Sequence, residues 1–547
     1  MPFWTNYIFS IIPKMTVRPS TSLALSILLT LGLFHSRIIS PAFAMGTDFF
    51  SFAHRIGLSS SQSQSLKSKY DCAVSNGSAI LDVACQAARD SLGTSQVDGS
   101  PVNKTLAEEN WSLTCAATPY CIILPQSAAD VSKALQIINY FKLKFATRSG
   151  GHSPNPGWSS IGQGGILLDL QKLNQTTLSS DKKVASLGPG ARWGDVIATL
   201  GAQDATVVSG RNPLVGVGGL LLGGGYHHTS PEYGIAADNV KNFEVALSNG
   251  SIVNANAESN SDLFWALKGG GPNFGIVTRF DVYTIPVDEI WYQIAIYSAD
   301  QGDAILDIFA KWQLKEGSSD PKANIILSLG TESHVIGLIY SAPTNGLPSA
   351  FAPFSDLEIL MAAVPATNGT FATLNAALAP FIPTEHLRHD YMGASSLVDA
   401  QLYKDVYSFW LDRAVSAHQT TGANLTFVLQ HVASSMATQG IARGGNPLNI
   451  HPETHQWWTT LVDWENEKDD DVARAVSIDT VEQWKQLGQE RGLYLPFVFM
   501  NDGSRNQNPI AGYGEESISR LREVSKKYDA SQMFQTLQNG GFRLVNV

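Results

Sequence analysis

The sequence is poor in charge and has no long basic run, and these shortages exclude two kinds of partner. Charged residues make up 16% of the 547 residues, and 37 Lys and Arg against 48 Asp and Glu give a formal net charge of −11. Binding to a phosphate backbone needs a concentrated basic face, so we expect no nucleic-acid partner. Beyond residue 44 no apolar stretch approaches the ~20 residues that span a bilayer, so we expect no membrane partner for the mature chain.

Several cofactor and catalytic motifs are also missing. After Gly216 and Gly218, a dinucleotide-binding fingerprint needs a third glycine at the position of Leu221, and no Gly-Lys pair makes a phosphate-binding P-loop. The absence of Gly-x-Ser-x-Gly removes the commonest sign of a serine hydrolase. His451 and His455 are four residues apart, but the Glu between them is not where a zincin has it. We therefore expect no metal site, and we interpret this segment as the cap and first turn of a helix.

The first 44 residues have the features of a secretory signal peptide. Lys14 and Arg18 precede an apolar run over 23–34, and Ala42-Phe43-Ala44 offers a cleavage site between small residues. The alternative, a membrane anchor, is weakened because this run has only about 12 residues where ~20 are needed. We therefore expect a secreted protein that begins near Met45.

The chain has 4 cysteines, and all of them lie in its N-terminal quarter: Cys72, Cys85, Cys115 and Cys121. Paired Cys-x-x-Cys spacings, which are typical of structural metal sites, are absent. In an exported chain the cysteines predict two disulfides that join the lead-in over 45–116 to the first domain, with three pairings open. Sequons that agree with secretion stand at Asn76, Asn103, Asn110, Asn174, Asn249, Asn368 and Asn424.

Hydrophobic periodicity predicts an α+β domain over 117–288. A strand over 121–124, a helix capped by Ser127 and ending near Phe141, and a short second strand form a β-α-β start. Further strands are predicted at 165–170, 184–187, 205–209, 243–247, 252–255 and 276–285, with a helix near 193–200. Ser248-Asn249-Gly250 predicts a hairpin with a type I′ turn, in which both central residues need positive φ.

A second domain is predicted over 289–495. It has strand-like runs at 290–297, 323–329 and 335–340, and helical stretches near 304–315 and 395–414. The tail over 496–547 contains a charged helix at 515–528, which we expect to return to the first domain.

Three glycine clusters within 80 residues carry the strongest chemical signal. They are Arg148-Ser149-Gly150-Gly151-His152, Gly188-Pro189-Gly190 with Gly194, and Gly216-Val217-Gly218-Gly219 followed by Gly223-Gly224-Gly225-Tyr226. Such glycines let the backbone approach a ligand and present N–H groups to an anion. One cluster alone would be read as a turn, but three in one domain favour a long phosphate-bearing cofactor.

At these residues the chain resembles the berberine-bridge-enzyme-like branch of the vanillyl-alcohol-oxidase (PCMH) flavoproteins. The resemblance also rests on the runs at 233–239 and 262–271, on Tyr528-Asp529 and on Gly540-Gly541-Phe542. It implies a two-part PCMH-type FAD-binding domain and an α/β substrate domain with an antiparallel sheet. It further implies that the loops at 148–153 and 216–226 grip FAD, and that His152 bonds to the flavin 8α carbon.

The resemblance assigns the cofactor contacts to a defined set of residues: Arg148, Ser149, Gly150, Gly151, His152, Ser153, Gly188, Gly190, Gly194, Gly210, Gly216, Val217, Gly218, Gly219, Gly223, Gly224, Tyr226, Gly234, Ala236, Asp238, Val240, Ile276, Val277 and Asn501.

Two departures from the family pattern matter. Many relatives have a second flavin bond from a cysteine, at the position of Asn212 in this chain, so we expect a single bond. No match to the catalytic glutamate of the alkaloid-forming members is found, and 435–446 has no acid. Tyr226, His228 and Tyr494 are the candidate catalytic residues by position, and each could instead be a packing residue.

These features predict a secreted FAD-dependent oxidase that takes a hydride from a small organic substrate and reduces dioxygen to hydrogen peroxide. A secondary metabolite is the expected substrate, and a carbohydrate is the alternative. A dehydrogenase that uses another electron acceptor, or a non-catalytic flavin glycoprotein, also remains open.

Overall fold

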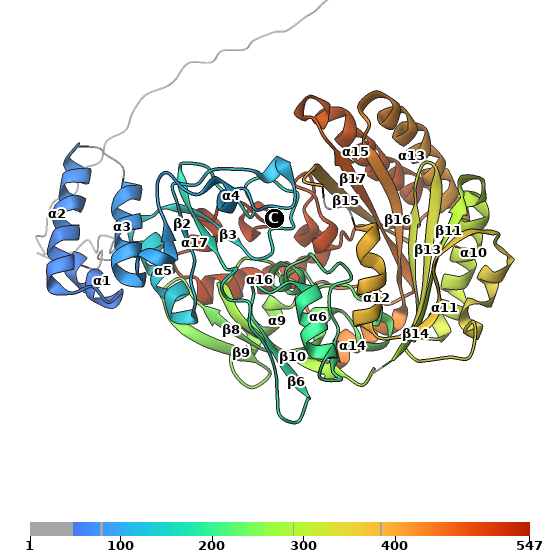
Figure 1. Cartoon of the computed structure of the whole chain (residues 1–547), viewed down its shortest axis with the longest axis horizontal. Helices are drawn as coiled ribbons and strands as arrows, with labels where there is room; N and C mark the ends of the chain where they lie inside the picture. Colours follow the sequence, from blue (N-terminus) through green and yellow to red (C-terminus); the bar gives the residue numbers. More distant parts are fainter. Residues whose placement is uncertain (1–47, 77–79, 288, 383–384) are drawn as a thin grey trace, which may run out of the picture. The chain divides into compact units, whose positions relative to one another are not determined.

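The computed structural model describes residues 48–76, 80–287, 289–382 and 385–547, which form three β-sheets with their covering helices (Figure 1). The expected signal peptide over 1–44 lies outside the described residues, so secretion stays a prediction. No helix among the described residues is long and apolar enough to cross a membrane.

Three helices lead into the first domain: α1 (Phe49–Arg55), α2 (Ser60–Asn76) and α3 (Ile80–Leu92). The apolar face of α3, which includes Val83 and Ala87, is buried in one core with α5 (Ala128–Phe141). Phe52 of α1 stacks on Tyr140 of α5 with ring centroids 4.0 Å apart. The lead-in is therefore held to the first domain by an apolar core.

One of the two predicted disulfides forms, and the prediction of a second is wrong. Cys85 of α3 is bonded to Cys121, while Cys72 is exposed and Cys115 is buried, both as free thiols. Cys72 lies on the solvent side of α2, whereas the Cys115 thiol lies 3.3 Å from the Ser153 carbonyl oxygen. One thiol is therefore at the surface and the other is in the interior, so they do not meet.

The first sheet confirms the β-α-β start. Its strands are β1 (Val97–Asp98), β2 (Cys121–Ile123), β4 (Gly165–Asp169) and β3 (Lys144–Arg148), in that order. The strands β2, β4 and β3 run parallel, and β4 lies between the two strands that α5 connects. The Ser127 side chain caps α5 by accepting a hydrogen bond from Asp130 N.

The second sheet has the order β5 (Thr176–Leu178), β6 (Val184–Leu187), β10 (Ile276–Ile285), β8 (Val240–Ala246) and β9 (Ile252–Asn256), and β7 (Thr206–Val207) also pairs with β10. The helices of this region are α6 (Trp193–Gly201), α7 (Val217–Leu222), α8 (Ser230–Tyr233) and α9 (Ser261–Leu267).

The predicted hairpin joins β8 and β9, but its turn differs from the predicted type. Gly250 has φ +86°, and its N–H donates to the Leu247 carbonyl, while Asn249 is not in the positive-φ region. This is a three-residue connection with glycine in the left-handed position, so only one residue needs positive φ.

The third sheet is antiparallel and has eight strands in the order β14 (Ile359–Gly369), β11 (Ile290–Ser298), β13 (Ser333–Tyr340), β12 (Ala323–Leu329), β16 (Asn424–Val432), β17 (His455–Trp464), β15 (Arg388–Leu397) and β18 (Tyr494–Leu495). The helices α10 (Gly302–Leu314), α13 (Ala400–Thr421) and α15 (Asp470–Glu490) share a core with one face of the sheet (Figure 1). The opposite face contributes Val432 and Trp457 to the core of the first domain. The α+β fold is thus confirmed.

Two sequence interpretations in this region are wrong. The stretch over 395–414 begins inside β15 and becomes helical only at Ala400, where Asp399 caps α13. The segment from His451 to His455 is not a helix start, because it leads directly into β17. In both cases, pairing between β15 and β17 overrides the local pattern.

The C-terminal segment includes the predicted helix α16 (Glu515–Tyr528) and a short helix α17 (Met533–Thr536). Tyr528 donates a hydrogen bond to Asp262 at the start of α9, and Gln538 bridges to Phe145 of β3. The remaining short helices are α4 (Lys104–Ala107), α11 (Glu316–Ser319), α12 (Phe371–Leu378) and α14 (Ser434–Ala442).

Candidate active site

The first and third glycine clusters meet backbone to backbone. A Cβ added to Gly150 would lie 2.5 Å from the Cα of Gly216, and one added to Gly216 would lie 2.4 Å from the Gly150 nitrogen. Ser149 Oγ also donates to the Pro189 carbonyl at 2.5 Å, and Val217 N donates to the Ala191 carbonyl. The fold therefore brings all three clusters to one place, and glycine at 150 and 216 permits the contact.

A cavity of about 400 Å³ opens where these clusters meet. Ser149, Gly150 and Gly190 line it together with Arg192, Glu109 and Asp195. Arg192 brings a positive charge beside glycine-rich backbone, the combination that binds phosphate, while Glu109 and Asp195 add negative charge to the same lining and Asp169 is paired with Arg148. Sequence reasoning missed Arg192, although its place in the Gly-Pro-Gly-Ala-Arg run was the signal available.

Gly188, Gly190 and Gly194 have a packing role. Added Cβ atoms at Gly188 and Gly190 would lie 2.1 Å and 2.0 Å from the carbonyl oxygens of Leu173 and Leu170, and one at Gly194 would lie 2.9 Å from Pro213. These glycines therefore seat the second cluster against the turn that follows β4.

Arg148 lines the cavity, but its guanidinium is bonded to protein groups. Its guanidinium forms a buried ion pair with Asp169 at 2.5 Å and donates to the carbonyls of Leu106 and Ala107. It also bonds to Asn110 Oδ1 at 3.2 Å. The structure thus gives Arg148 the role of fixing the strand end from which the His152 turn begins.

The imidazole of His152 is held by stacked rings. Trp111 stacks on it with ring centroids 4.1 Å apart, and its other side stacks on His389 of β15 at 3.8 Å. His389 is in turn oriented by Asp463 of β17, through an Nδ1 to Oδ1 contact of 2.7 Å. Sequence reasoning missed these three partners because 41 to 311 residues separate them from His152.

His152 is neutral and has an unused nitrogen. Burial, and then the charges of Arg192 and His389, lower the pKa of His152 to about 3. Its Nε2 is buried and has no hydrogen-bond partner among the described residues. A neutral imidazole with a free lone pair is the form that can act as a nucleophile.

A second set of contacts connects the 219–225 loop to the C-terminal segment. Asn501 accepts a hydrogen bond from Gly225 N at 2.9 Å and donates to the Gly219 carbonyl at 3.3 Å. Gly223 packs on the Asn501 amide, and Ala236 N donates to the Gly225 carbonyl. The structure therefore brings Asn501 and Ala236 to the same loop, and their contacts to the cofactor stay predictions.

Other expected cofactor residues have their side chains in the protein interior. Val217, Val240, Ile276 and Val277 are buried in apolar cores. Asp238 accepts hydrogen bonds from Ile235 N and Asn446.

Gly210 packs on Trp193, Gly218 packs on Pro189, and Gly224 and Gly234 have φ of +114° and +79°. Gly151 has φ +67° and packs on Arg148, and Ser153 Oγ accepts from Asn155 N. These residues shape the loops, and contacts to a cofactor through their backbones stay predictions.

Of the three candidate catalytic residues, Tyr226 and His228 lie near Asn324, and Tyr494 lies apart from them. The Tyr226 hydroxyl is buried and donates to the His431 carbonyl at 2.5 Å, so its proton is already engaged. Burial, followed by the charges of His227 and Arg211, holds the pKa of His228 well below its usual value. Tyr494 lies on β18, four strand spacings or about 19 Å from β12, the strand whose Asn324 contacts Tyr226.

Asn212 stands at the edge of the third cluster, where its side chain accepts a hydrogen bond from Leu214 N at 2.9 Å. Cys115, left unpaired, is the thiol beside the His152 turn. Burial raises the pKa of Cys115 to about 11, so the thiol is protonated and a poor nucleophile. Cys115 is therefore a poor partner for a second flavin bond, although it forms no disulfide.

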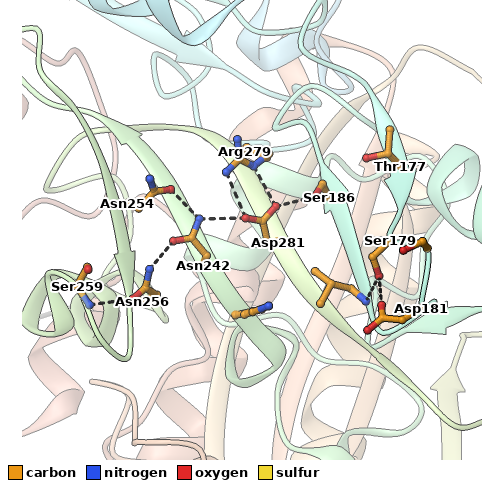
Figure 2. Close-up of a pocket in the computed structure, with 13 residues that line it drawn as sticks. Thr177, Ser179, Asp181, Ser186, Asn242, Asn254, Asn256, Ser259, Arg279 and Asp281 are labelled. Atoms are coloured by element: carbon orange, nitrogen blue, oxygen red, sulfur yellow. Dashed lines mark hydrogen bonds and ion pairs between the residues drawn. The ribbon is translucent and has the colours of Figure 1, made fainter.

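A larger polar groove lies on the second sheet, away from these loops. Figure 2 shows Arg279, Asp281 and Asn242 hydrogen bonded along its floor. Its volume is about 950 Å³, and none of the expected cofactor residues lines it. This groove belongs to the outer surface of the first domain.

The residues present fit FAD. The phosphate-compatible cavity lies on one side of the Gly150–Gly216 contact, and the unused His152 nitrogen lies just beyond the same turn. Gly219 is exposed, and a Cβ there would meet nothing within 4 Å, which leaves room for a flat ring. Ser149, Gly150, Gly190 and Arg192 would hold the phosphates, and His152 and Gly219 would face the flavin.

Comparisons with known proteins agree with this geometry. The family described as an FAD binding domain matches residues 119–256. An FAD-dependent monooxygenase of Arthrobotrys oligospora is 37% identical over 440 residues, which cover 80% of this chain and 84% of that protein. The bifunctional solanapyrone synthase of Alternaria solani is 33% identical over 436 residues, covering 79% and 83% of the two chains.

A solved structure shares the fold at low identity. The glucooligosaccharide oxidase of Acremonium strictum is 18% identical, with a TM-score of 0.67 over 81% of this chain and 96% of that one. The FAD of that protein is described as 6-S-cysteinyl and 8α-N1-histidyl.

Proposed function

Because the chain belongs to the berberine-bridge-enzyme-like branch of the PCMH-type FAD-linked oxidoreductases, we propose that it is an oxidase with FAD bonded covalently to His152. Ser149, Gly150, Gly190, Arg192 and His152 would hold the FAD, and the chemistry it would supply is the removal of a hydride from a small organic substrate and the reduction of dioxygen to hydrogen peroxide.

The observation that carries this proposal is the state of His152. Its imidazole is neutral, its ring is fixed by Trp111, and its Nε2 has no partner among the described residues. A buried polar atom without a partner is costly unless a bound group uses the site. The FAD of the Acremonium strictum oxidase, described as 8α-N1-histidyl, gives a precedent for a histidine-linked flavin within the same fold.

We propose a secondary metabolite as the substrate class. The relative from Alternaria solani is named a solanapyrone synthase, and it covers most of the chain. The sheet face opposite α13 and α15 presents aromatic side chains such as Tyr391 and Trp457 toward the first domain. An aromatic side chain such as Tyr391, which packs near Trp111 beside the proposed flavin attachment, suits a largely apolar substrate.

A monooxygenase is the second candidate, because several relatives carry that name. An oxidase returns both oxygen atoms as peroxide, whereas a monooxygenase leaves one in the product. Reaction under ¹⁸O₂ separates the two, since an oxidase product carries no label. A carbohydrate oxidase or a dehydrogenase would be recognised by its substrate panel or by its electron acceptor.

The test of the proposed function uses the purified full chain. Panels of polyketide-type alcohols and of oligosaccharides are screened for peroxide release and for anaerobic bleaching of the flavin. We expect bleaching by members of the first panel and one peroxide per substrate oxidised. A protein that binds FAD but is bleached by neither panel would contradict an oxidase function.

We also propose that the protein is secreted and glycosylated. The signal-peptide features and the disulfide between Cys85 and Cys121 support export. Asn110 is buried and donates to Ser159 Oγ at 2.7 Å, so glycans would have to occupy the exposed sequons at Asn76, Asn103, Asn174, Asn249, Asn368 and Asn424. Edman sequencing of secreted protein should begin near Met45; a retained N-terminus would contradict export.

A further inference from the structure

The carboxylate of Asp502 lies between the glycine-rich loops and the eight-stranded sheet. Asp502 ends the short turn over Met500–Asp502. A Cβ added to Gly393 of β15 would lie 3.7 Å from the Asp502 Cβ. Asp502 therefore lies over the sheet at a point where the strand has no side chain.

The segment that carries Asp502 connects both ends of the expected flavin site. Asn501, one residue before it, bonds to the 219–225 loop. The carbonyl of Gly503, one residue after it, accepts from Asn155 Nδ2 at 3.1 Å, and Asn155 is three residues beyond His152. Asp502 is thus held between the loop expected at the flavin ring and the turn expected to carry its covalent bond.

The Asp502 carboxyl is held in place through one of its oxygens, and, among the described residues, its other oxygen is free to bind a substrate. Its Oδ2 accepts from Gln430 Nε2 of β16 at 2.7 Å, and Arg211 donates to the other end of the same Gln430 amide. Arg211 is itself fixed over the Tyr226 ring, 4.7 Å from its centroid. Among the described residues, Oδ1 of Asp502 has no hydrogen-bond partner, which leaves this oxygen available to a substrate.

We propose that Asp502 is the catalytic base, with Gln430 and Arg211 as the residues that position it; this inference rests on the proposed function. The substrate is an alcohol bound between Asp502 and the flavin. The hydroxyl proton moves to Oδ1, the O–H electron pair becomes the new C=O bond, and the carbinol hydrogen leaves with two electrons to FAD. The carboxyl then returns its proton to solvent before the next turnover.

The electrostatics favour this role over the earlier candidates. Burial raises the pKa of Asp502, while the Arg211 charge and the Gln430 hydrogen bond oppose that shift and preserve a usable carboxylate. Tyr391 of β15 is the other titratable group influenced by Asp502, and burial keeps it protonated. Tyr226, in contrast, already donates its proton to a backbone carbonyl.

Sulfite tests the placement without knowledge of the substrate, because it adds to N5 of an oxidised flavin and bleaches its visible absorbance. In the Asp502→Asn holoenzyme we expect the sulfite Kd to fall about tenfold or more, since a negative charge near N5 is removed. Asp281→Asn, the same change in the groove of Figure 2, should leave the Kd unchanged. Equal Kd values for Asp502→Asn and wild type would overturn the proposal.

The reductive half-reaction tests the chemistry. With any alcohol that bleaches the wild type, Asp502→Asn should slow anaerobic flavin reduction about 10²- to 10⁴-fold. If Asp502→Asn does not fold, Asp502→Ser should show the same two changes, a lower sulfite Kd and slower flavin reduction. Reduction at the wild-type rate would overturn the assignment of the base and leave the oxidase intact, whereas purified wild type without FAD would overturn both proposals.

Discussion

At the scale of single residues, Trp111 connects the eight-stranded sheet to the proposed flavin attachment. Its ring lies between His152 and His389, and each contact has an interplanar angle near parallel, at 11° and 6°. An aromatic pair contributes about 0.5–1.5 kcal/mol beyond its buried area. The position of the His152 ring therefore depends on a residue of the lead-in segment.

We expect Trp111→Leu to slow covalent flavin attachment about threefold to tenfold, in proportion to that contribution. The measurement is the time course of flavin fluorescence in the denatured protein band after FAD is added to apoprotein. Trp158→Leu, which removes a ring that packs on Phe542 instead, is the matched control. Equal rates in both variants would show that the stack does not align His152.

Gly219 provides a second test at this scale. Because a Cβ there would meet no protein atom within 4 Å, Gly219→Ala should keep or slightly raise the stability of the apoprotein, by about 0.5–1 kcal/mol within α7. The methyl group should however obstruct the flavin ring and lower the FAD content. Thermal unfolding and the ratio of flavin to protein absorbance measure the two effects. Gly162→Ala, also in open space, is the control, and full FAD content in Gly219→Ala would contradict the placement.

The residues that could be predicted from the sequence are those whose signal is local. His152 and the glycines stand within short runs, and their spacing alone excluded other cofactor folds. Trp111, His389 and Asp463 could not be found, because each is ordinary in its local context and gains its role only through contacts with residues distant in the sequence. Asp502 was missed for the same reason.

At the scale of elements, the disulfide joins α3 to β2 across 36 residues. Closing a loop of this length in the unfolded chain gives about 3–4 kcal/mol of stabilisation in the chain-entropy account. We expect Cys85→Ser to lower the free energy of unfolding by that amount, while Cys72→Ser, which removes an exposed free thiol, leaves it unchanged. Urea unfolding of the two variants measures this.

Thiol titration checks the corrected pairing directly. Native protein should react at Cys72 alone, and denatured protein at Cys72 and Cys115, because Cys115 is buried. If denatured protein has no reactive thiol, Cys72 and Cys115 form a second disulfide and the corrected pairing is wrong.

Strands and helices with strong periodicity were predicted closely, and β10, β12 and α16 have the expected bounds. The errors fall where long-range pairing decides the structure. The stretch at 395–414 has helical periodicity, but its first residues pair with β17 and β18. A pattern read in one window carries no information about such partners.

At the scale of the whole molecule, several buried histidines are neutral in the folded state. Burial lowers the pKa of His227 and of His455 to about 3 and that of His431 to about 4, against about 6.5 in the unfolded chain. Their contribution to stability is complete above about pH 6.5 and is lost as pH falls, because the unfolded state then binds protons that the folded state excludes. Below about pH 6.5, each of these histidines can lower the free energy of unfolding by up to about 1.4 kcal/mol per pH unit.

We therefore expect the free energy of unfolding to decrease between about pH 7 and about pH 5. His227→Phe, which keeps a ring beside Phe371, should reduce that decrease. The exposed His54 gives the control variant, His54→Phe, which should leave it unchanged. Urea unfolding midpoints of each variant at about pH 7 and about pH 5 measure this decrease. If His227→Phe shows the same decrease as the wild type, His227 does not contribute to the pH dependence of stability.

The central claim is that FAD is bonded to this chain once, at His152, and peptide mass mapping tests it most directly. Trypsin should release residues 149–172, with His152 inside, and residues 105–133, with Cys115 inside, as separate peptides. We predict the flavin mass on the 149–172 peptide alone. Flavin on neither peptide, or a flavin that cross-links the 149–172 peptide to a second segment, would contradict the claim.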